Sequence, residues 1–344
     1  MIRTVLIGFG LSAKVFHLPF LQTLPAFELI ALSTRQTFEA QKLGPGIQIF
    51  AQPEELLAQT EADLAIIATP NASHFALAEK ALQNGMHVVL EKPFVNTLAE
   101  GKALIRLAEE KGRSLSVYHN RRWDGDFLTL QNLLQQKRLG EIHFFHSHFD
   151  RFRPHVQDRW RENPGPGTGS WFDLGSHLLD QALLLFGWPE AVNARILPTR
   201  KNAKVADYFH VQLHYPGLEV LLTGSAFVAG PKLRFELQGE LGTYRKFGMD
   251  PQEERLKQGI QPLGDTWAAE AETAHGTLWF ENSHETLPTW TGGYQNYYQA
   301  LAQALENQGE LPVTAQEALN VIYLLELAEQ SAQLNKTLEV APAC

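Results

Sequence analysis

The chain has 344 residues, of which 44% are hydrophobic and 19% charged, and its net charge is −9. At about 100–200 residues per domain this length predicts two domains, and the apolar content is sufficient for two cores. The acidic balance argues against a nucleic-acid-binding protein, because such proteins usually carry a basic surplus. The single cysteine, Cys344, excludes an intramolecular disulfide and a cysteine-rich zinc site.

The apolar segments of the chain are short. Those such as Ala182–Trp188 fall far below the ~20 residues that span a bilayer. The N-terminal segment is charged too early, at Arg3 and Lys14, for a secretory signal. We therefore expect a cytoplasmic protein that binds neither a membrane nor nucleic acid.

Short apolar segments alternate with helical patterns in the N-terminal part of the chain. Such segments, typical of strands covered on both faces, are Ile2–Gly8, Phe27–Ser33, Asp63–Ala68, His87–Leu90 and Ser114–Val117. Helices are expected at His74–Asn84 and Thr97–Lys111, ended by Gly85 and Gly112. This alternation predicts an α/β fold, with a doubly wound parallel sheet in a dinucleotide-binding Rossmann domain over residues 1–120.

The second part of the chain has consecutive strand patterns instead. The expected strands are Asp207–Tyr215, Glu219–Phe227, Leu233–Gln238 and Thr277–Glu281, and the expected closing helices are Tyr294–Asn307 and Ala315–Leu334. Thr314 and Glu317 form a capping box before the last helix. We therefore expect an α+β domain over residues 121–344, with a large, mostly antiparallel open sheet. The boundary between the domains is expected near 118–125. The alternative is that the closing helix packs back on the first domain.

A glycine-rich turn follows the first expected strand. Gly8, Gly10 and Ala13 occupy the three small positions of the G-x-G-x-x-G/A pattern, and a helix begins there. In this context Gly8 permits the turn, Gly10 lets the backbone approach a pyrophosphate, and Ala13 permits close packing of helix on strand. The turn predicts a dinucleotide site; the alternative is an ordinary glycine turn of an α/β protein.

The end of the second strand indicates which dinucleotide is bound. An NAD site usually places Asp or Glu there, to accept from the ribose 2′-hydroxyl. This chain has Ser33 and Arg35, whereas Glu28 lies near the start of the strand. Because Ser33 and Arg35 suit a 2′-phosphate, we predict NADP; the alternative is that Arg35 is only a solvated surface residue.

A narrow polar stripe crosses the apolar helix expected over Trp171–Gly187. With Asp173 as origin, 100° per residue places His177 at about 40° and Asp180 at about −20°. Polar groups on such a helix need partners or a water-filled cleft. His177 is a candidate acid/base because its unperturbed pKa lies near 6.5. The alternative is that Asp173 and His177 merely pair on a solvated face.

Four further elements carry a resemblance to a known family. They are Ala68-Thr69-Pro70-Asn71 with His74, Glu91-Lys92-Pro93, His119-Asn120-Arg121-Arg122, and Asp173-x-x-x-His177-x-x-Asp180. In this order, behind the Rossmann turn, they make the chain resemble the Gfo/Idh/MocA family of NAD(P)-dependent oxidoreductases over nearly its whole length. Phe149–Pro154 is similar to the branch of that family that contains NADP-dependent scyllo-inositol dehydrogenases.

The resemblance implies roles for these residues. Lys92 lies beside substrate and nicotinamide and stabilises a developing alkoxide. His177 exchanges the proton, and Asp173 or Asp180 orients its ring and stabilises its charged form. Asp180, Asn120 and Arg121, with Lys92, are implied substrate contacts. The implied cofactor contacts are Thr69, Asn71, His74, Glu91 and Lys92, in addition to Gly8, Gly10, Ala13, Ser33 and Arg35.

Several of these residues have a second interpretation. Asn71 also suits a helix N-cap, and Arg121 also suits a domain-linking ion pair. A local basic patch, formed by Arg151, Arg153, Arg159 and Arg161 around Phe152 and Trp160, suits a substrate pocket or a subunit contact better than nucleic acid. His146 and His148 alternate onto one strand face, but no third ligand supports a metal, so no metal is expected.

These observations lead to one predicted activity. It is an NADP-dependent dehydrogenase that moves a hydride between nicotinamide and a secondary hydroxyl or ketone of a cyclic polyol or sugar, such as scyllo-inositol. The alternatives are a reductase of another carbonyl or imine and a non-catalytic NAD(P)-binding regulatory protein. A sheet with one uncovered face, and the dimers common in the family, lead us to expect a homodimer or higher homo-oligomer.

Overall fold

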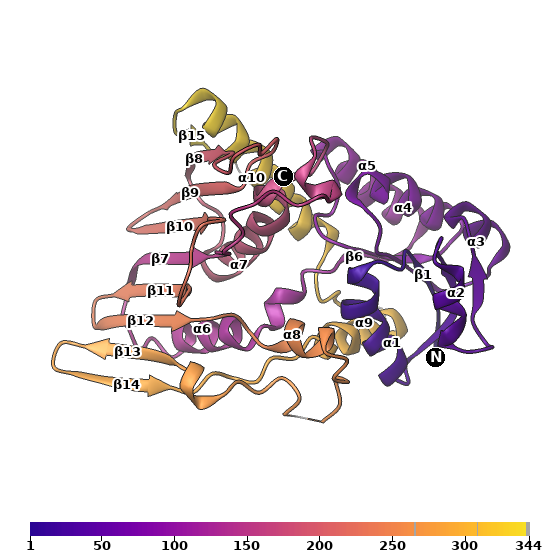
Figure 1. Cartoon of the computed structure of the whole chain (residues 1–344), viewed down its shortest axis with the longest axis horizontal. Helices are drawn as coiled ribbons and strands as arrows, with labels where there is room; N and C mark the ends of the chain where they lie inside the picture. The colour runs from indigo at the N-terminus through magenta and orange to yellow at the C-terminus, as the bar shows by residue number, and fades with distance from the viewer. Residues whose placement is uncertain (265, 308, 342–344) are drawn as a thin grey trace. The chain divides into compact units, whose positions relative to one another are not determined.

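The computed structural model describes residues 1–264, 266–307 and 309–341 (Figure 1), so Cys344 lies outside the described residues. Contacts divide the chain into two compact units. Unit 1 contains Met1–Asn120, Gln252–Ala268 and Gly293–Leu319; unit 2 contains Arg121–Pro251, Ala269–Gly292 and Asn320–Cys344. The single boundary predicted after residue 120 therefore does not account for two later segments that belong with unit 1.

A six-stranded parallel sheet forms the centre of unit 1 among the described residues, in the order β3-β2-β1-β4-β5-β6. Its strands are β1 (Ile2–Ile7), β2 (Phe27–Ser33), β3 (Gln48–Phe50), β4 (Leu64–Ile67), β5 (His87–Leu90) and β6 (Leu115–Val117). This is the strand order of a Rossmann fold, and the reversal between β1 and β4 is where such a sheet binds its ligand. The predicted doubly wound sheet is confirmed.

Unit 1 contains the helices α1 (Leu18–Thr23), α2 (Thr37–Ala40), α3 (Pro53–Gln59), α4 (His74–Gln83), α5 (Leu98–Lys111), α8 (Gln252–Lys257) and α9 (Gln295–Asn307). Among these helices, α4, α5 and α9 match expected helices with small shifts. Thr97 and Glu100 form a capping box before α5, and Gly112 ends that helix in a left-handed conformation. In Figure 1, α4 and α5 lie side by side, and together they cover part of the apolar sheet.

A nine-stranded sheet organises the described part of unit 2, in the order β14-β13-β12-β11-β7-β10-β9-β8-β15. Its strands are β7 (Ile142–His148), β8 (Ala191–Leu197), β9 (Tyr208–Tyr215), β10 (Leu218–Gly224), β11 (Leu233–Gly239), β12 (Gly242–Phe247), β13 (Gly276–Phe280), β14 (Ser283–Leu287) and β15 (Leu338–Glu339). All neighbours are antiparallel except β7 and β10. The predicted large, mostly antiparallel sheet is confirmed.

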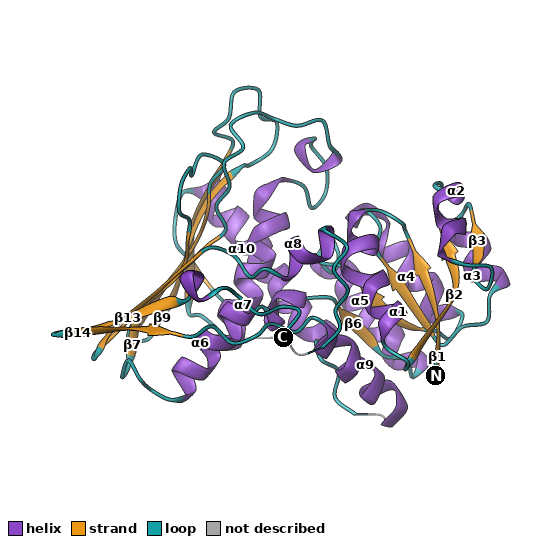
Figure 2. Ribbon diagram, turned by 60° about the horizontal axis from the view of Figure 1, so that its bottom comes forward, coloured by secondary structure: helices purple, strands orange, loops and turns teal. Residues whose placement is uncertain are grey.

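One face of this sheet is buried by helices. Figure 2 shows the sheet nearly edge-on, with α6 (Gly125–Gln135) and α7 (Ser176–Phe186) on the same side. Buried and half-buried residues alternate along β9, because successive side chains point to opposite faces. The last helix, α10 (Ala315–Leu334), begins in unit 1 and continues in unit 2. Thr314 and Glu317 form its predicted capping box, with Glu317 N–H donating to Thr314 Oγ1 at 3.1 Å.

Two segments that carry candidate site residues are π-helical rather than α-helical. Ala13–His17 follows the glycine-rich turn, and Trp171–Gly175 precedes α7. The regular α-helix predicted over Trp171–Gly187 therefore begins as α-helix only at Ser176. In a π-turn the backbone hydrogen bond joins residues five positions apart, instead of four as in an α-helix. The α-helical angle of 100° per residue therefore gives the wrong position of Asp173 relative to His177. Single π-turns occur frequently at functional sites.

Candidate active site

The glycine-rich turn follows β1 in unit 1 and lies against the ends of β2 and β4. Gly8 has a φ of 103°, and its N–H donates to the Ser33 carbonyl at 3.0 Å. A Cβ on Gly8 would overlap the backbone carbonyl of Ala68, at the end of β4. The fold itself therefore requires glycine here, both for its backbone conformation and for the close approach.

Gly10 is a glycine for a different reason. A Cβ built on it meets no atom within 4 Å among residues 1–264, 266–307 and 309–341, and Gly10 is not among the residues of positive φ. The protein itself therefore leaves space there, which is what close approach of a pyrophosphate to this backbone would need. Ala13 is fully buried where the next helical turn packs on the sheet. The residues present fit a dinucleotide.

The end of β2 lies next to this turn. Ser33 and Thr34 are buried, whereas Arg35 is exposed, and its guanidinium has no hydrogen bond or ion pair with the part of the chain that the structure describes. Lys14 Nζ donates to Gln36 Oε1 at 3.1 Å and pairs with Glu39 Oε1 at 2.9 Å. A free arginine and a second cation, Lys14, therefore lie at this edge. Lys14 was not among the predicted site residues.

Glu91 is held in a buried cluster in unit 1. Its carboxylate accepts from Ser12 Oγ, from His17 Nε2 at 3.0 Å and from the backbone N–H of Lys92 at 3.0 Å. Burial alone would raise the pKa of Glu91, but the hydrogen bond and charge of His17, with the Ser12 bond, lower it to about 2. His17 Nδ1 is in turn 2.5 Å from Tyr298 Oη on α9.

This cluster was not predicted, and it changes the interpretation of Glu91. The carboxylate bonds Ser12 of the glycine-rich turn and the backbone of Lys92 at once. Its observed contacts therefore fix the position of both segments. Burial also raises the pKa of Tyr298 well above its usual value, with the nearby tyrosines and Glu91 contributing, so that phenol stays protonated.

Lys92 follows β5 at the carboxyl edge of the sheet, and its side chain is half-buried. His74 lies behind the following segment: its Nδ1 is 3.1 Å from the Pro93 carbonyl and its Nε2 is 3.0 Å from the Thr69 carbonyl. Burial lowers the pKa of His74, so the ring is neutral at pH 7. The structure thus shows His74 linking the loops that follow β4 and β5.

Asn71 does not serve as the N-cap of α4. It begins a 3₁₀ turn, Asn71–Ser73, and the N-cap position of α4 is Ser73. The Asn71 residue is buried, and its backbone carbonyl accepts from Asn96 Nδ2 at 3.2 Å. Thr69 Oγ1 accepts from Ser73 Oγ at 2.7 Å, so these loop residues support one another at the carboxyl edge of β4.

The predicted acid/base group lies in unit 2. His177 and Asp180 are buried on α7, while Asp173, on the preceding π-turn, is part-exposed and pairs with Arg161 at 3.3 Å. The His177 ring stacks on Phe149, with ring centroids 6.2 Å apart. Asp180 accepts from Arg122 through both oxygens, at 2.7 and 2.9 Å. Arg122 belongs to the quoted His-Asn-Arg-Arg element but was not among the predicted site residues.

Asn120 and Arg121 are both buried. Arg121 pairs with Asp124 at 3.2 Å, within unit 2, and its guanidinium lies 5.0 Å from the Phe149 ring. This ion pair lies inside one unit. Phe149 thus contacts both His177 and Arg121, although the sequence analysis used it only as part of a resemblance.

His146 and His148 lie on β7 as predicted, with ring centroids 3.6 Å apart. Burial, with the charges of His148 and His210, lowers the pKa of His146 to about 3. Over the described ranges, no group of three or more His, Cys, Asp or Glu side chains is arranged to hold a metal ion. No described helix is both long and apolar enough to cross a membrane.

Comparisons with known proteins place this architecture in a family. A family model described as the NAD-binding Rossmann fold of an oxidoreductase family matches residues 2–119. Its companion, the C-terminal alpha/beta domain of the same family, matches residues 131–340. The chain belongs to the Gfo/Idh/MocA oxidoreductase family.

Members of this family resemble the chain from end to end. It is 44% identical over 342 residues to the uncharacterized oxidoreductase YdgJ of Escherichia coli, covering 99% of each chain. It is 39% identical to the scyllo-inositol 2-dehydrogenase (NADP(+)) IolW of Bacillus subtilis, covering 98% of this chain and 95% of the relative. Among solved structures, the putative oxidoreductase yvaA of B. subtilis has a TM-score of 0.95 at 37% identity, with 99% of both chains covered.

Proposed function

We propose that this oxidoreductase uses NADP to oxidise a secondary hydroxyl of a cyclic polyol or sugar, or to reduce the corresponding ketone. The single observation that carries the proposal is the end of β2. Arg35, which is exposed and has no side-chain partner among the residues that the structure describes, lies there two positions after Ser33, whose carbonyl accepts from the N–H of Gly8 in the glycine-rich turn.

The preference for NADP rests on charge. A carboxylate at the end of β2 would accept from the ribose 2′-hydroxyl of NAD and would repel a 2′-phosphate. An arginine instead donates charge-assisted hydrogen bonds to phosphate. Lys14 adds a second cation, although Glu39 offsets part of its charge. The name of the relative IolW, which is NADP-dependent, agrees with this choice.

The proposed chemistry uses the cofactor and four side chains. NADP supplies the hydride chemistry when bound. We assign the proton transfer to a ring nitrogen of His177, which takes the hydroxyl proton during oxidation and returns it during reduction. The ammonium of Lys92 stabilises the negative charge that develops on the reacting oxygen. The Asp173 carboxylate stabilises the charged form of His177 and orients its ring. Asp180, whose position is fixed by Arg122, contacts the substrate.

Two other functions start from the same family. A reductase of another carbonyl or an imine would use the same groups on a different substrate. A regulatory NAD(P)-binding protein would need the nucleotide site alone. The second is disfavoured because Lys92, Asp173, His177 and Asp180 are all present, and a sensor has no need of a proton-transfer set.

The test is a turnover screen with purified protein. Cyclic polyols, including scyllo-inositol and myo-inositol, and simple sugars are incubated with NADP, and in parallel with NAD, while formation of the reduced nicotinamide is followed by absorbance. We expect turnover with at least one polyol and a preference for NADP. Binding of NADPH without turnover in either direction would instead support the regulatory function.

A further inference from the structure

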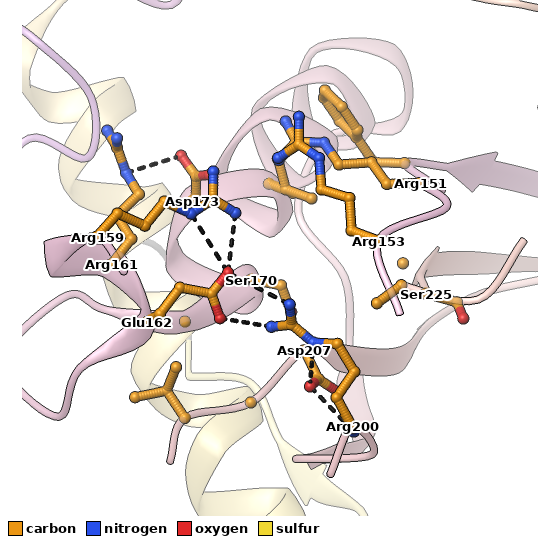
Figure 3. A pocket seen from close by; sticks show the side chains of 17 residues that line it. Arg151, Arg153, Arg159, Arg161, Glu162, Ser170, Asp173, Arg200, Asp207 and Ser225 are labelled. Atoms are coloured by element: carbon orange, nitrogen blue, oxygen red, sulfur yellow. Dashed lines mark hydrogen bonds and ion pairs between the residues drawn. The ribbon is translucent and has the colours of Figure 1, made fainter. Parts of the chain in front are cut away.

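An arginine-rich pocket opens in unit 2 (Figure 3). It contains about 500 Å³ of non-protein space, part of it open to solvent. Its charged lining consists of five arginines and three carboxylates, an excess of two positive charges: Arg151, Arg153, Arg159, Arg161 and Arg200, with Glu162, Asp173 and Asp207. Four of these arginines form the basic patch predicted from the sequence, and Arg200 joins them from a distant segment.

The base of the pocket is fixed by its own ion pairs. Arg200 donates to Glu162 Oε2 at 2.5 Å and to Asp207 Oδ2 at 2.7 Å, and all three side chains are more than nine-tenths buried. Hydrogen bonds outweigh burial and lower the pKa values of both carboxylates, chiefly from Arg200 for Glu162 and from Thr199 and then Arg200 for Asp207. These carboxylates are therefore ionised, and Arg200 serves to build the pocket.

The remaining arginines face this base. Figure 3 shows Arg159 and Arg161 on one side and Arg151 and Arg153 on the other. Arg159 pairs with Glu162 at 2.9 Å and Arg161 with Asp173 at 3.3 Å. Arg153 is half-buried, and its guanidinium has no hydrogen bond or ion pair with any residue that the structure describes.

A second observation also points to a ligand. The hydroxyl of Ser170 lines the pocket, and although this oxygen is buried it has no hydrogen-bond partner among the described residues. A buried polar group without a partner costs free energy. An oxyanion in the pocket would accept from Ser170 and Arg153 together, with the planar guanidinium suited to two oxygens at once.

The pocket adjoins the proposed acid/base group. Asp173 lines it from the π-turn that leads into α7, and Phe149 lines it while its ring stacks on that of His177. Arg151 and Arg153 are held by backbone bonds to the segment after β10, with Arg153 N–H donating to the Ala226 carbonyl at 2.8 Å. These cationic side chains therefore lie beside α7, the helix that carries His177.

We propose that this pocket binds an anionic group of the substrate, a phosphate ester or a carboxylate, carried by the polyol or sugar that His177 acts on. The proposal rests on the proposed function and narrows its substrate class to polyols and sugars that carry an acidic group. Arg153 and Ser170 are its specificity-determining residues, and the ion pairs of Glu162, Arg200 and Asp207 form the base of the pocket.

Kinetics provide the first test. Reduction and oxidation are compared for matched substrates that are neutral, phosphorylated or carboxylated, for example glucose, glucose 6-phosphate and glucuronate, with NADP(H). We expect a higher kcat/KM for an acidic member. In Arg153→Gln the ratio of acidic to neutral kcat/KM falls by about 10- to 100-fold. The phosphate and carboxylate arms show which oxyanion is bound.

The matched control is Arg195→Gln, an exposed arginine on β8 of the same unit. It should leave the ratio unchanged. Equal ratios in the wild type, Arg153→Gln and Arg195→Gln would overturn the proposal. So would a change of oligomeric state in Arg153→Gln with no change in the ratio, because the arginines would then serve a subunit contact.

A binding measurement separates this proposal from the proposed function. Inorganic phosphate and acetate are titrated calorimetrically into the Arg35→Ala protein, which lacks the arginine proposed above to hold a phosphate. We expect binding that is lost when Arg153→Gln or Ser170→Ala is added. If no substrate is turned over but this binding is found, the anion site stands and the dehydrogenase assignment fails; binding equal in all these variants overturns the anion site.

Discussion

The Glu91 cluster of unit 1 and the arginine-rich pocket of unit 2 hold their charged side chains in different ways. In unit 1, Glu91 is bonded to Ser12, to His17 and to the backbone of Lys92, so the protein itself supplies its partners. In unit 2, the arginines that line the pocket exceed the carboxylates, and Arg153 has no partner among the described residues. The comparison teaches that a charged side chain with partners inside the protein fixes the positions of the segments it joins. A charged side chain without such a partner instead indicates where a ligand binds.

Mutations can break this comparison, since side chains matched by the protein should affect stability and unmatched side chains should affect binding or turnover. The largest effect is expected at the proposed acid/base group. His177→Ala should lower kcat by about 10²- to 10⁴-fold, the usual contribution of general acid–base catalysis. NADPH affinity should change little, because the proposed contacts of the dinucleotide lie in the glycine-rich turn and at the end of β2 and do not include His177.

Steady-state turnover and a fluorescence titration with NADPH check this prediction. His143→Ala, an exposed histidine at the start of β7, is the matched control and should keep full activity. Equal kcat in the two variants would remove His177 from the mechanism.

The two glycines of the nucleotide turn provide the next comparison. Gly8→Ala should destabilise the protein by about 3 kcal/mol, because alanine is strained at φ 103° and its Cβ would overlap the Ala68 carbonyl. Gly10→Ala should leave the free energy of unfolding nearly unchanged and weaken dinucleotide binding. Urea unfolding and NADPH titration of both variants measure the difference, and similar stability losses would contradict it.

Glu91 makes a pH-dependent contribution. Its pKa is about 2 in the folded protein against an ordinary value of 4.5. The stabilisation is therefore fully present above pH 4.5 and is lost as the pH falls toward 2. At pH 7, Glu91→Gln should lower the free energy of unfolding by about 3 kcal/mol.

The difference between wild type and Glu91→Gln should narrow steadily from pH 4.5 downward. Denaturant unfolding across this range provides the measurement, with Glu110→Gln on the exposed side of α5 as control. A difference that stayed constant with pH would show that the ionised carboxylate is not what stabilises the cluster.

Much of the fold was predictable because its signals are local. The alternation of apolar segments and helices, with Gly8 after the first of them, is sufficient to predict the parallel sheet. The capping box at Thr314 and Glu317 defines the start of α10. By contrast, β3 has only three residues, of which one is exposed, and no hydrophobic period can develop over that length.

The site was less predictable because its pairs are distant in sequence. Arg200 lies 38 residues from Glu162, and His17 lies 74 residues from Glu91. No spacing rule connects such residues; only the folded chain brings them together. The π-turn at Trp171–Gly175 also has no marker in the sequence, so a regular helix was expected through Asp173.

Arg35 tests the central claim most directly. NADPH and NADH are titrated into the wild type, Arg35→Ala and Arg106→Ala, an exposed arginine on α5, while tryptophan fluorescence is followed. We predict tighter binding of NADPH than NADH in the wild type and in Arg106→Ala. In Arg35→Ala the affinity for NADPH alone should fall by about 10- to 100-fold. Equal binding of both nucleotides, or a preference that survives Arg35→Ala, would contradict the assignment of NADP to the end of β2.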